Sequence, residues 1–108
     1  MNELEMKKEL VEDLFKVYGY WFDKIGNIEL KSYKKKGTEH TEEFVVLTWS
    51  NGGISTANNN INSLSATARN VARMIDGGVY ENLDLYKKIM ESDEWEEIIG
   101  GQHEEIKS

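Results

Sequence analysis

Histidines and carboxylates are the residues of this chain whose chemistry could support catalysis or metal binding. The two histidines are His40, in a polar stretch between two strand-like segments, and His103, close to the end of the chain. Neither belongs to a His-x-x-x-His pair or another zinc-binding spacing. Because nucleophilic catalysis needs a histidine that is buried and oriented by a partner, we expect both to be surface residues. We therefore expect a protein that is not an enzyme.

The densest cluster of carboxylates surrounds Trp95 and consists of Asp93, Glu94, Glu96 and Glu97. A calcium loop would need alternating oxygen ligands and a glycine within about twelve residues, and this pattern is absent. The chain also has no cysteine, which excludes disulfides, thiolate metal sites and thiol catalysis. We expect neither a metal nor another cofactor, and interpret the cluster as the solvated, acidic start of a short last helix.

Two glycine pairs and one lysine run could suggest phosphate or nucleic-acid binding. The pairs, Gly52–Gly53 and Gly77–Gly78, do not lie in the G-x-G-x-x-G or G-x-x-x-x-G-K-[ST] patterns of phosphate loops. They are typical of a hairpin turn and a helix end. The lysine run at 34–36 is followed by three glutamates before residue 44, so we expect little net positive field there.

The hairpin at Trp49–Ser55 could be a recognition tip, or a turn whose tryptophan belongs to the core. A tryptophan supplies an anchor, while asparagine, serine and glycine supply adaptable hydrogen bonds on a loop. A second amide-rich stretch follows at 58–60. The alternative partner-binding residues predicted from this pattern are Trp49, Asn51, Asn58, Asn59 and Asn60.

Hydrophobic periodicity predicts the elements that must position these residues. Apolar residues recur at spacings of three and four over 3–25, with Asn2 as the expected helix cap. Both faces of Phe44–Leu47 are apolar, which predicts a central strand or one covered on both sides. The expected elements are a helix at 3–25, strands at 28–34, 43–49 and 53–58, helices at 64–76, 83–91 and 93–99, and a frayed tail at 102–108.

This pattern predicts an α+β fold with a three-stranded antiparallel sheet and packed helices, in the order α-β-β-β-α-α. We expect the strands at 28–58 to form a meander whose one face is covered by helices. A chain of 108 residues has the length of one domain, so we expect residues 1–108 to form a single domain.

The net charge of −7 lies in the last third of the chain. Residues 1–75 carry ten acidic and ten basic side chains, whereas residues 76–108 carry ten acidic and three basic ones. Direct nucleic-acid binding is not expected, because phosphate contacts need lysine and arginine. No apolar run approaches the ~18 residues of a membrane helix, and the start of the chain lacks a signal-peptide pattern. We expect a protein of the cytoplasm.

The segments Val46–Ser55, Asn62–Ala66 and Met74–Tyr80 resemble small acidic proteins carried by prophages and conjugative elements of Gram-positive bacteria. This family of mobile-element proteins includes small anti-CRISPR proteins that are compact and lack an active site. The resemblance implies a protein of a bacterial host cell that inhibits or modulates by binding. It transfers no functional residue to this chain.

The leading hypothesis is therefore a non-enzymatic inhibitor of a nucleic-acid-handling protein such as an RNA-guided CRISPR nuclease. Its acidic surface would compete with nucleic acid for a basic surface of that partner. The predicted partner-binding residues are Asp84, Tyr86, Glu91, Asp93, Glu94, Trp95, Glu96 and Glu97. The alternative is a self-associating structural or adaptor module, in which aromatic residues of the first helix and an exposed strand edge form a homodimer interface.

Overall fold

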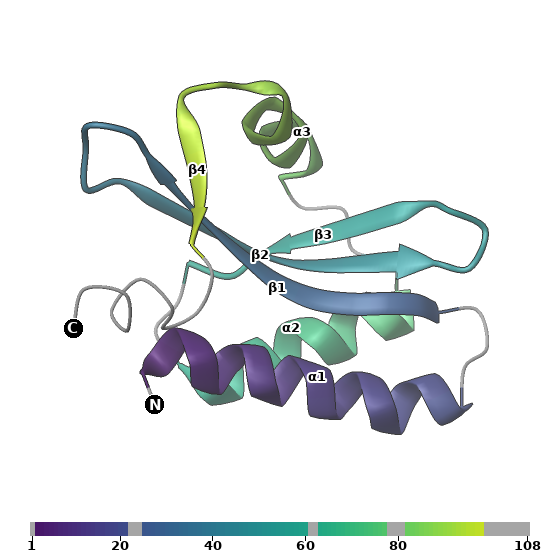
Figure 1. The fold of residues 1–108 in the computed structure, drawn as a ribbon. Helices are drawn as coiled ribbons and strands as arrows, with labels where there is room; N and C mark the ends of the chain where they lie inside the picture. Colours follow the sequence, from purple (N-terminus) through teal and green to yellow (C-terminus); the bar gives the residue numbers. More distant parts are fainter. Residues whose placement is uncertain (1, 22–24, 61–62, 78–81, 99–108) are drawn as a thin grey trace.

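The chain forms a four-stranded antiparallel sheet with two helices on one face and a third helix on the other (Figure 1). The computed structural model describes residues 2–21, 25–60, 63–77 and 82–98, without the side chains of 18–21 and 77. The strand order across the sheet is β3-β2-β1-β4. The elements are α1 (Glu3–Trp21), β1 (Ile25–Lys35), β2 (Thr41–Trp49), β3 (Ile54–Asn58), α2 (Leu64–Gly77), α3 (Leu83–Glu91) and β4 (Trp95–Ile98).

The α+β class is confirmed, but the expected count of three strands is wrong. Residues 95–98 form β4 instead of a last helix, so the element order is α-β-β-β-α-α-β. This strand pairs with the end of β1, where Trp95 lies opposite Lys35 and Ile98 lies opposite Ser32. Four residues are too few to separate a helical from an alternating pattern in the sequence. The free backbone edge of β1 decides the conformation.

The first helix is shorter than expected, and the first strand is longer. Helix α1 ends at Trp21 and β1 begins at Ile25, which pairs with Trp49. The predicted cap is confirmed, because Asn2 Oδ1 accepts a 2.8 Å hydrogen bond from the Glu5 backbone N–H. The Asn2 backbone N–H donates in return to Glu5 Oε1 at 3.4 Å, which completes a capping box. The expected tail at 102–108 lies outside the described residues.

Strand β2 is central and is covered on both faces, as its apolar sequence predicts. Val45 and Leu47 point toward α1 and α2, whereas Phe44 and Val46 point toward α3. Helices therefore lie on both faces, and the expectation of one covered face is wrong. The first core contains Val11, Ile25, Ile28, Leu30, Val45, Leu47, Ala57, Val71 and Met74. The second contains Tyr33, Phe44, Val46, Tyr86 and Ile89.

The hairpin between β2 and β3 is confirmed, and its connection has four residues, 50–53, one more than the expected strand bounds leave. Gly52 adopts a φ of 94°, a conformation that favours glycine. The Trp49 backbone N–H donates to Gly53 O at 2.8 Å and closes the loop. Asn51 Oδ1 accepts a 2.9 Å hydrogen bond from the Gly53 N–H. The asparagine side chain therefore shapes the turn.

Candidate functional site

The predicted acidic residues lie in α3, in β4 and in the short connection between them. All six side chains are exposed to solvent. None takes part in an ion pair among the described residues, where the pairs involve other carboxylates. We call this group the α3–β4 carboxylates, and it consists of Asp84, Glu91, Asp93, Glu94, Glu96 and Glu97.

The two aromatic residues predicted beside these carboxylates have different environments. Tyr86 is only 6% exposed and packs edge-on against Phe44, with ring centroids 5.4 Å apart. It belongs to the second core and is not available as a surface anchor. Trp95 is half-buried against the same core, and its ring centroid lies 5.5 Å from that of His40. Trp95 therefore supports β4 and presents only part of its ring to a partner.

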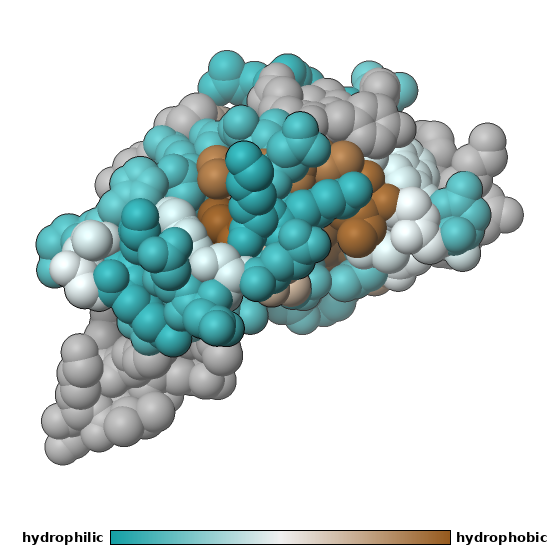
Figure 2. Space-filling model, turned by 90° about the horizontal axis from the view of Figure 1, so that it is seen from above, coloured by the Kyte–Doolittle hydropathy of each residue, from teal (hydrophilic) through white to brown (hydrophobic). Residues whose placement is uncertain are grey.

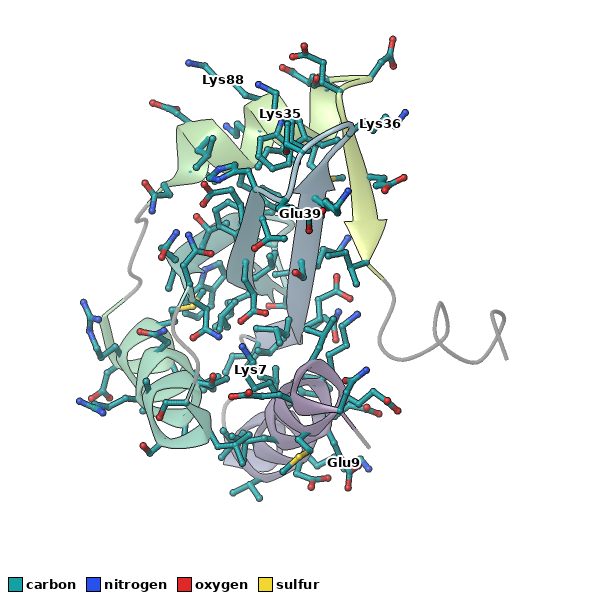
Figure 3. All side chains as sticks on the ribbon, turned by 90° about the vertical axis from the view of Figure 1, so that its left-hand side faces the viewer. Lys7, Glu9, Lys35, Lys36, Glu39 and Lys88 are labelled. Carbon is teal, nitrogen blue, oxygen red and sulfur yellow. The ribbon has the colours of Figure 1, made fainter. Side chains whose placement is uncertain are left out.

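Strand pairing also places basic residues beside the carboxylates. Lys34 lies opposite Glu96 in the β1–β4 register, and the Lys36 backbone N–H donates to Glu94 O at 2.8 Å. Figure 3 shows Lys35, Lys36 and Lys88 at the same end of the molecule as β4. The surface is therefore a mixture of both charges. The sequence could not predict this juxtaposition, because the basic run and β4 are about sixty residues apart.

Figure 2 shows the face that carries α3 and β4. Hydrophilic residues lie over most of this face, and hydrophobic residues gather near its centre. Two large apolar residues on this face are exposed: Ile54 is 40% accessible to solvent and Met90 is 52% accessible. Met90 also has a structural contact, because the Tyr33 hydroxyl donates to its Sδ atom at 3.2 Å.

The alternative recognition residues are used largely inside the fold. Trp49 Nε1 donates to Ser55 Oγ at 2.9 Å, and the Trp49 ring packs against the first core. Asn58 Oδ1 accepts a hydrogen bond from the Asn60 N–H at 3.1 Å. Asn60 Oδ1 accepts another from the Glu43 N–H at 2.6 Å. These bonds order the connection after β3. Of the alternative set, Asn51 and Asn60 are exposed, whereas Trp49, Asn58 and Asn59 are partly or fully buried.

Asn59 is the centre of a buried polar network that the sequence reasoning missed. Its side chain is inaccessible to solvent, and its Nδ2 atom donates to Glu43 Oε1 at 2.8 Å and to Thr67 Oγ1 at 3.0 Å. Asn70 Nδ2 donates to Asn59 Oδ1 at 2.6 Å. Lys7 Nζ completes the network 2.7 Å from the same Glu43 oxygen. The network joins α1, β2, α2 and the connection that follows β3.

The sequence carries a signal for this network. Lys7 precedes Val11 by four residues on the apolar stripe of α1, and Glu43 precedes Val45 and Leu47 at the inward spacing of β2. Figure 3 shows Lys7 pointing from α1 toward the sheet, whereas Glu9 points away from it. A charged residue at an inward position predicts a buried partner.

The chemistry of this network is structural. No buried side-chain nitrogen or oxygen among the described residues lacks a hydrogen-bond partner. Neither Lys7 nor Glu43 lines any of the described cavities. A buried network whose polar atoms are satisfied fixes the packing of its elements.

No three histidine or carboxylate side chains lie close enough together to hold a metal ion in the described ranges, 2–21, 25–60, 63–77 and 82–98. His40 is exposed, as predicted, and its Nε2 lies 2.7 Å from Glu42 Oε2. His103 lies outside the described residues. No helix in the described part of the chain is both long and apolar enough to cross a membrane. Comparison with protein-family models, curated proteins and solved structures finds no match in any of the three.

Proposed function

We propose that the chain is a non-catalytic binding protein that docks on a basic surface of a nucleic-acid-handling protein and competes there with nucleic acid. The observation that carries the proposal is the exposure of all six α3–β4 carboxylates, none of them in a described ion pair. An RNA-guided nuclease is the concrete case, because it holds nucleic acid in a positively charged channel. Carboxylates of the inhibitor would occupy positions that phosphates otherwise take.

The lysines beside β4 define what kind of recognition this surface supports. Because Lys34 and Lys36 lie next to Glu96 and Glu94, the long-range negative field of this surface is partly cancelled. Affinity would come from individual carboxylates that bind arginine or lysine at short range, where charge-assisted hydrogen bonds are strongest. The proposal therefore requires specific glutamates and is not satisfied by net charge alone.

The test compares two triple charge reversals in the full chain. The first is Glu94→Lys, Glu96→Lys and Glu97→Lys. The matched control is Glu9→Lys, Asp13→Lys and Asp76→Lys, three exposed carboxylates that lie on α1 and α2. Both variants change the net charge by the same amount. Binding to a guide-loaded RNA-guided nuclease, and inhibition of its target-DNA binding, would be measured at low and high salt.

We expect the first variant to weaken binding at least tenfold and the control to stay within threefold of the native chain. Equal losses in both variants would mean that net charge alone is recognised. Unchanged binding in both would show that another surface is used. No binding by the native chain would remove the nuclease from consideration as the target.

Self-association is the second candidate, and a different observation favours it. Met6 and Leu64 are 41% and 37% exposed and line, with Leu10, a groove of about 320 Å³ between α1 and the start of α2. Of the aromatic residues expected at this interface, Phe15 is half-buried against the first core, and the side chains of residues 18–22 lie outside the description. A dimer mass in light scattering at tens of micromolar protein, abolished by Leu64→Lys, would support this candidate.

A further inference from the structure

The outer edge of β1 is only partly paired. Strand β4 covers β1 from Ser32 to Lys35. Between Ile25 and Lys31, no strand in the described part of the chain lies on that side of β1. Figure 1 shows this stretch of β1 running above α1, to the right of β4. Among the described strands, the sheet therefore has an open edge position beside residues 25–31 of β1.

The hydrogen-bond pattern shows which backbone groups face this open position. The Lys35 N–H donates toward β2, to His40 O at 2.9 Å, and the Lys36 N–H donates to the other side, to Glu94 O at 2.8 Å. Backbone groups alternate in direction along an antiparallel strand. The even-numbered residues of β1 consequently face the outer edge. At the open position, these are Ile28 and Leu30, each of which directs one N–H and one C=O outward.

A cavity of about 240 Å³ lies along this edge. It is lined by Asn27 to Leu30 of β1, by Lys8 and Glu12 of α1 and by Glu97 of β4. An extended chain that paired with this edge would lie beside α1 and next to the end of β4. Main-chain pairing to a free strand edge is a common mode of peptide recognition.

The charge of the groove selects a basic occupant. Three carboxylates line it, those of Glu12, Glu29 and Glu97, against the single ammonium group of Lys8. Lys8 Nζ is already placed 3.4 Å from the backbone oxygen of Ile98. Glu29 Oε1 lies 3.6 Å from Lys31 Nζ, and the Glu29 side chain remains 46% exposed to solvent in this ion pair. Negative charge therefore exceeds positive charge along the groove.

We propose that the outer edge of β1, at residues 27–31, binds an extended basic segment of a partner protein as a fifth strand. Its backbone would pair with Ile28 and Leu30. Basic side chains on its two faces would meet Glu12 on the α1 side of the sheet and Glu29 on the α3 side. The chain's own residues 99–108 fit this charge poorly, because they contain two glutamates and one lysine. The site shares Glu97 with the α3–β4 carboxylates, but its strand edge and its other charged groups belong to β1 and α1, so it lies beyond the proposed function.

The test uses the full ¹⁵N-labelled chain and a defined probe, the peptide acetyl-Lys-Lys-Val-Lys-Lys-Val-amide, which presents lysines on both faces when it is extended. Two control peptides are matched to it. One replaces each lysine by glutamate, and the other is N-methylated at every residue, which keeps the charges but removes the backbone donors. We expect the amide signals of residues 27–31 to shift, and hydrogen exchange at Ile28 and Leu30 to slow at least tenfold. Both controls should bind at least tenfold more weakly.

Charge reversal in the protein gives an independent readout. The double variant Glu12→Lys and Glu29→Lys should lower the affinity for the lysine peptide at least tenfold. The control double variant, Glu9→Lys and Glu39→Lys, should change this affinity by less than threefold. The amide spectrum of each variant reports whether it is folded. The proposal is overturned if the shifts fall outside residues 27–31, or if the N-methylated peptide binds equally well. It is also overturned if exchange at Ile28 and Leu30 is already slow and the lysine peptide changes nothing, because the chain itself would then occupy the edge.

Discussion

Lys7 Nζ lies 2.7 Å from Glu43 Oε1, and both side chains are almost fully buried, at 6% and 12% exposure. This pair ties the first turns of α1 to the sheet. A buried ion pair contributes little to stability against an apolar replacement of the same shape, but the loss of one partner leaves an uncompensated charge.

Replacement of Lys7 by methionine should therefore lower the free energy of unfolding by about 3 kcal/mol. The Glu43 carboxylate would keep only its bond from Asn59. The double variant Lys7→Met and Glu43→Gln should be more stable than Lys7→Met alone, since it removes the isolated charge. Urea denaturation followed by circular dichroism measures both values. A double variant that is less stable than Lys7→Met would contradict this account.

Asn59→Ala should lower the free energy of unfolding by about 2 kcal/mol. The buried polar groups of Glu43, Thr67 and Asn70 would each lose one hydrogen-bond partner. Asn51→Ala is the matched control, as it removes an exposed turn bond and should cost about 0.5 kcal/mol. The same denaturation experiment compares the two. Equal losses would mean that the network is no more important than the turn.

We expect the protein to lose stability at alkaline pH because of the Tyr33 hydroxyl. Burial, reinforced by Tyr86 and Glu97, raises the pKa of Tyr33 above its usual value. The folded state therefore favours the protonated phenol. This contribution to stability is complete below about pH 10, the pKa of an unfolded tyrosine, and is lost as the pH rises further. Denaturation between pH 8 and 11.5 should show the decline.

The variant Tyr33→Phe is the control for this pH dependence. It keeps the ring packing against Phe44 but has no proton to lose. We expect its stability to fall less steeply above pH 10 than that of the native chain. Parallel curves for the two proteins would assign the alkaline loss to other groups.

Trp95→Ala should loosen β4 selectively. Its ring packs against the second core and against His40, and the strand itself has only four residues. Hydrogen exchange at residues 95–98 should accelerate at least tenfold, while exchange in β2 should change much less, because regions open with different free energies. Glu94→Ala is the neighbouring control and should leave β4 protected. Equal acceleration in β2 and β4 would indicate global destabilisation.

The sequence predicts the elements with strong local patterns and fails where pairing partners decide. The continuous apolar run of β2 and the periodicity of α2 and α3 are long enough to identify each element. The segment at 95–98 is not, because its conformation depends on the free edge of β1. The acidic positions of the candidate site were predictable from composition. The basic neighbours at 34–36 and the burial of Tyr86 were not, since both arise from contacts between distant segments.

The two cores on opposite faces of β2 make this strand unusually sensitive to length. Val45 and Leu47 belong to one core, and Phe44 and Val46 belong to the other. Because side chains alternate with a period of two, the insertion of a single residue ahead of Phe44 in β2 would send each of them into the opposite core. Evolutionary changes in chain length should therefore be confined to connections such as 36–40 and 50–53, where an added residue leaves both cores in register.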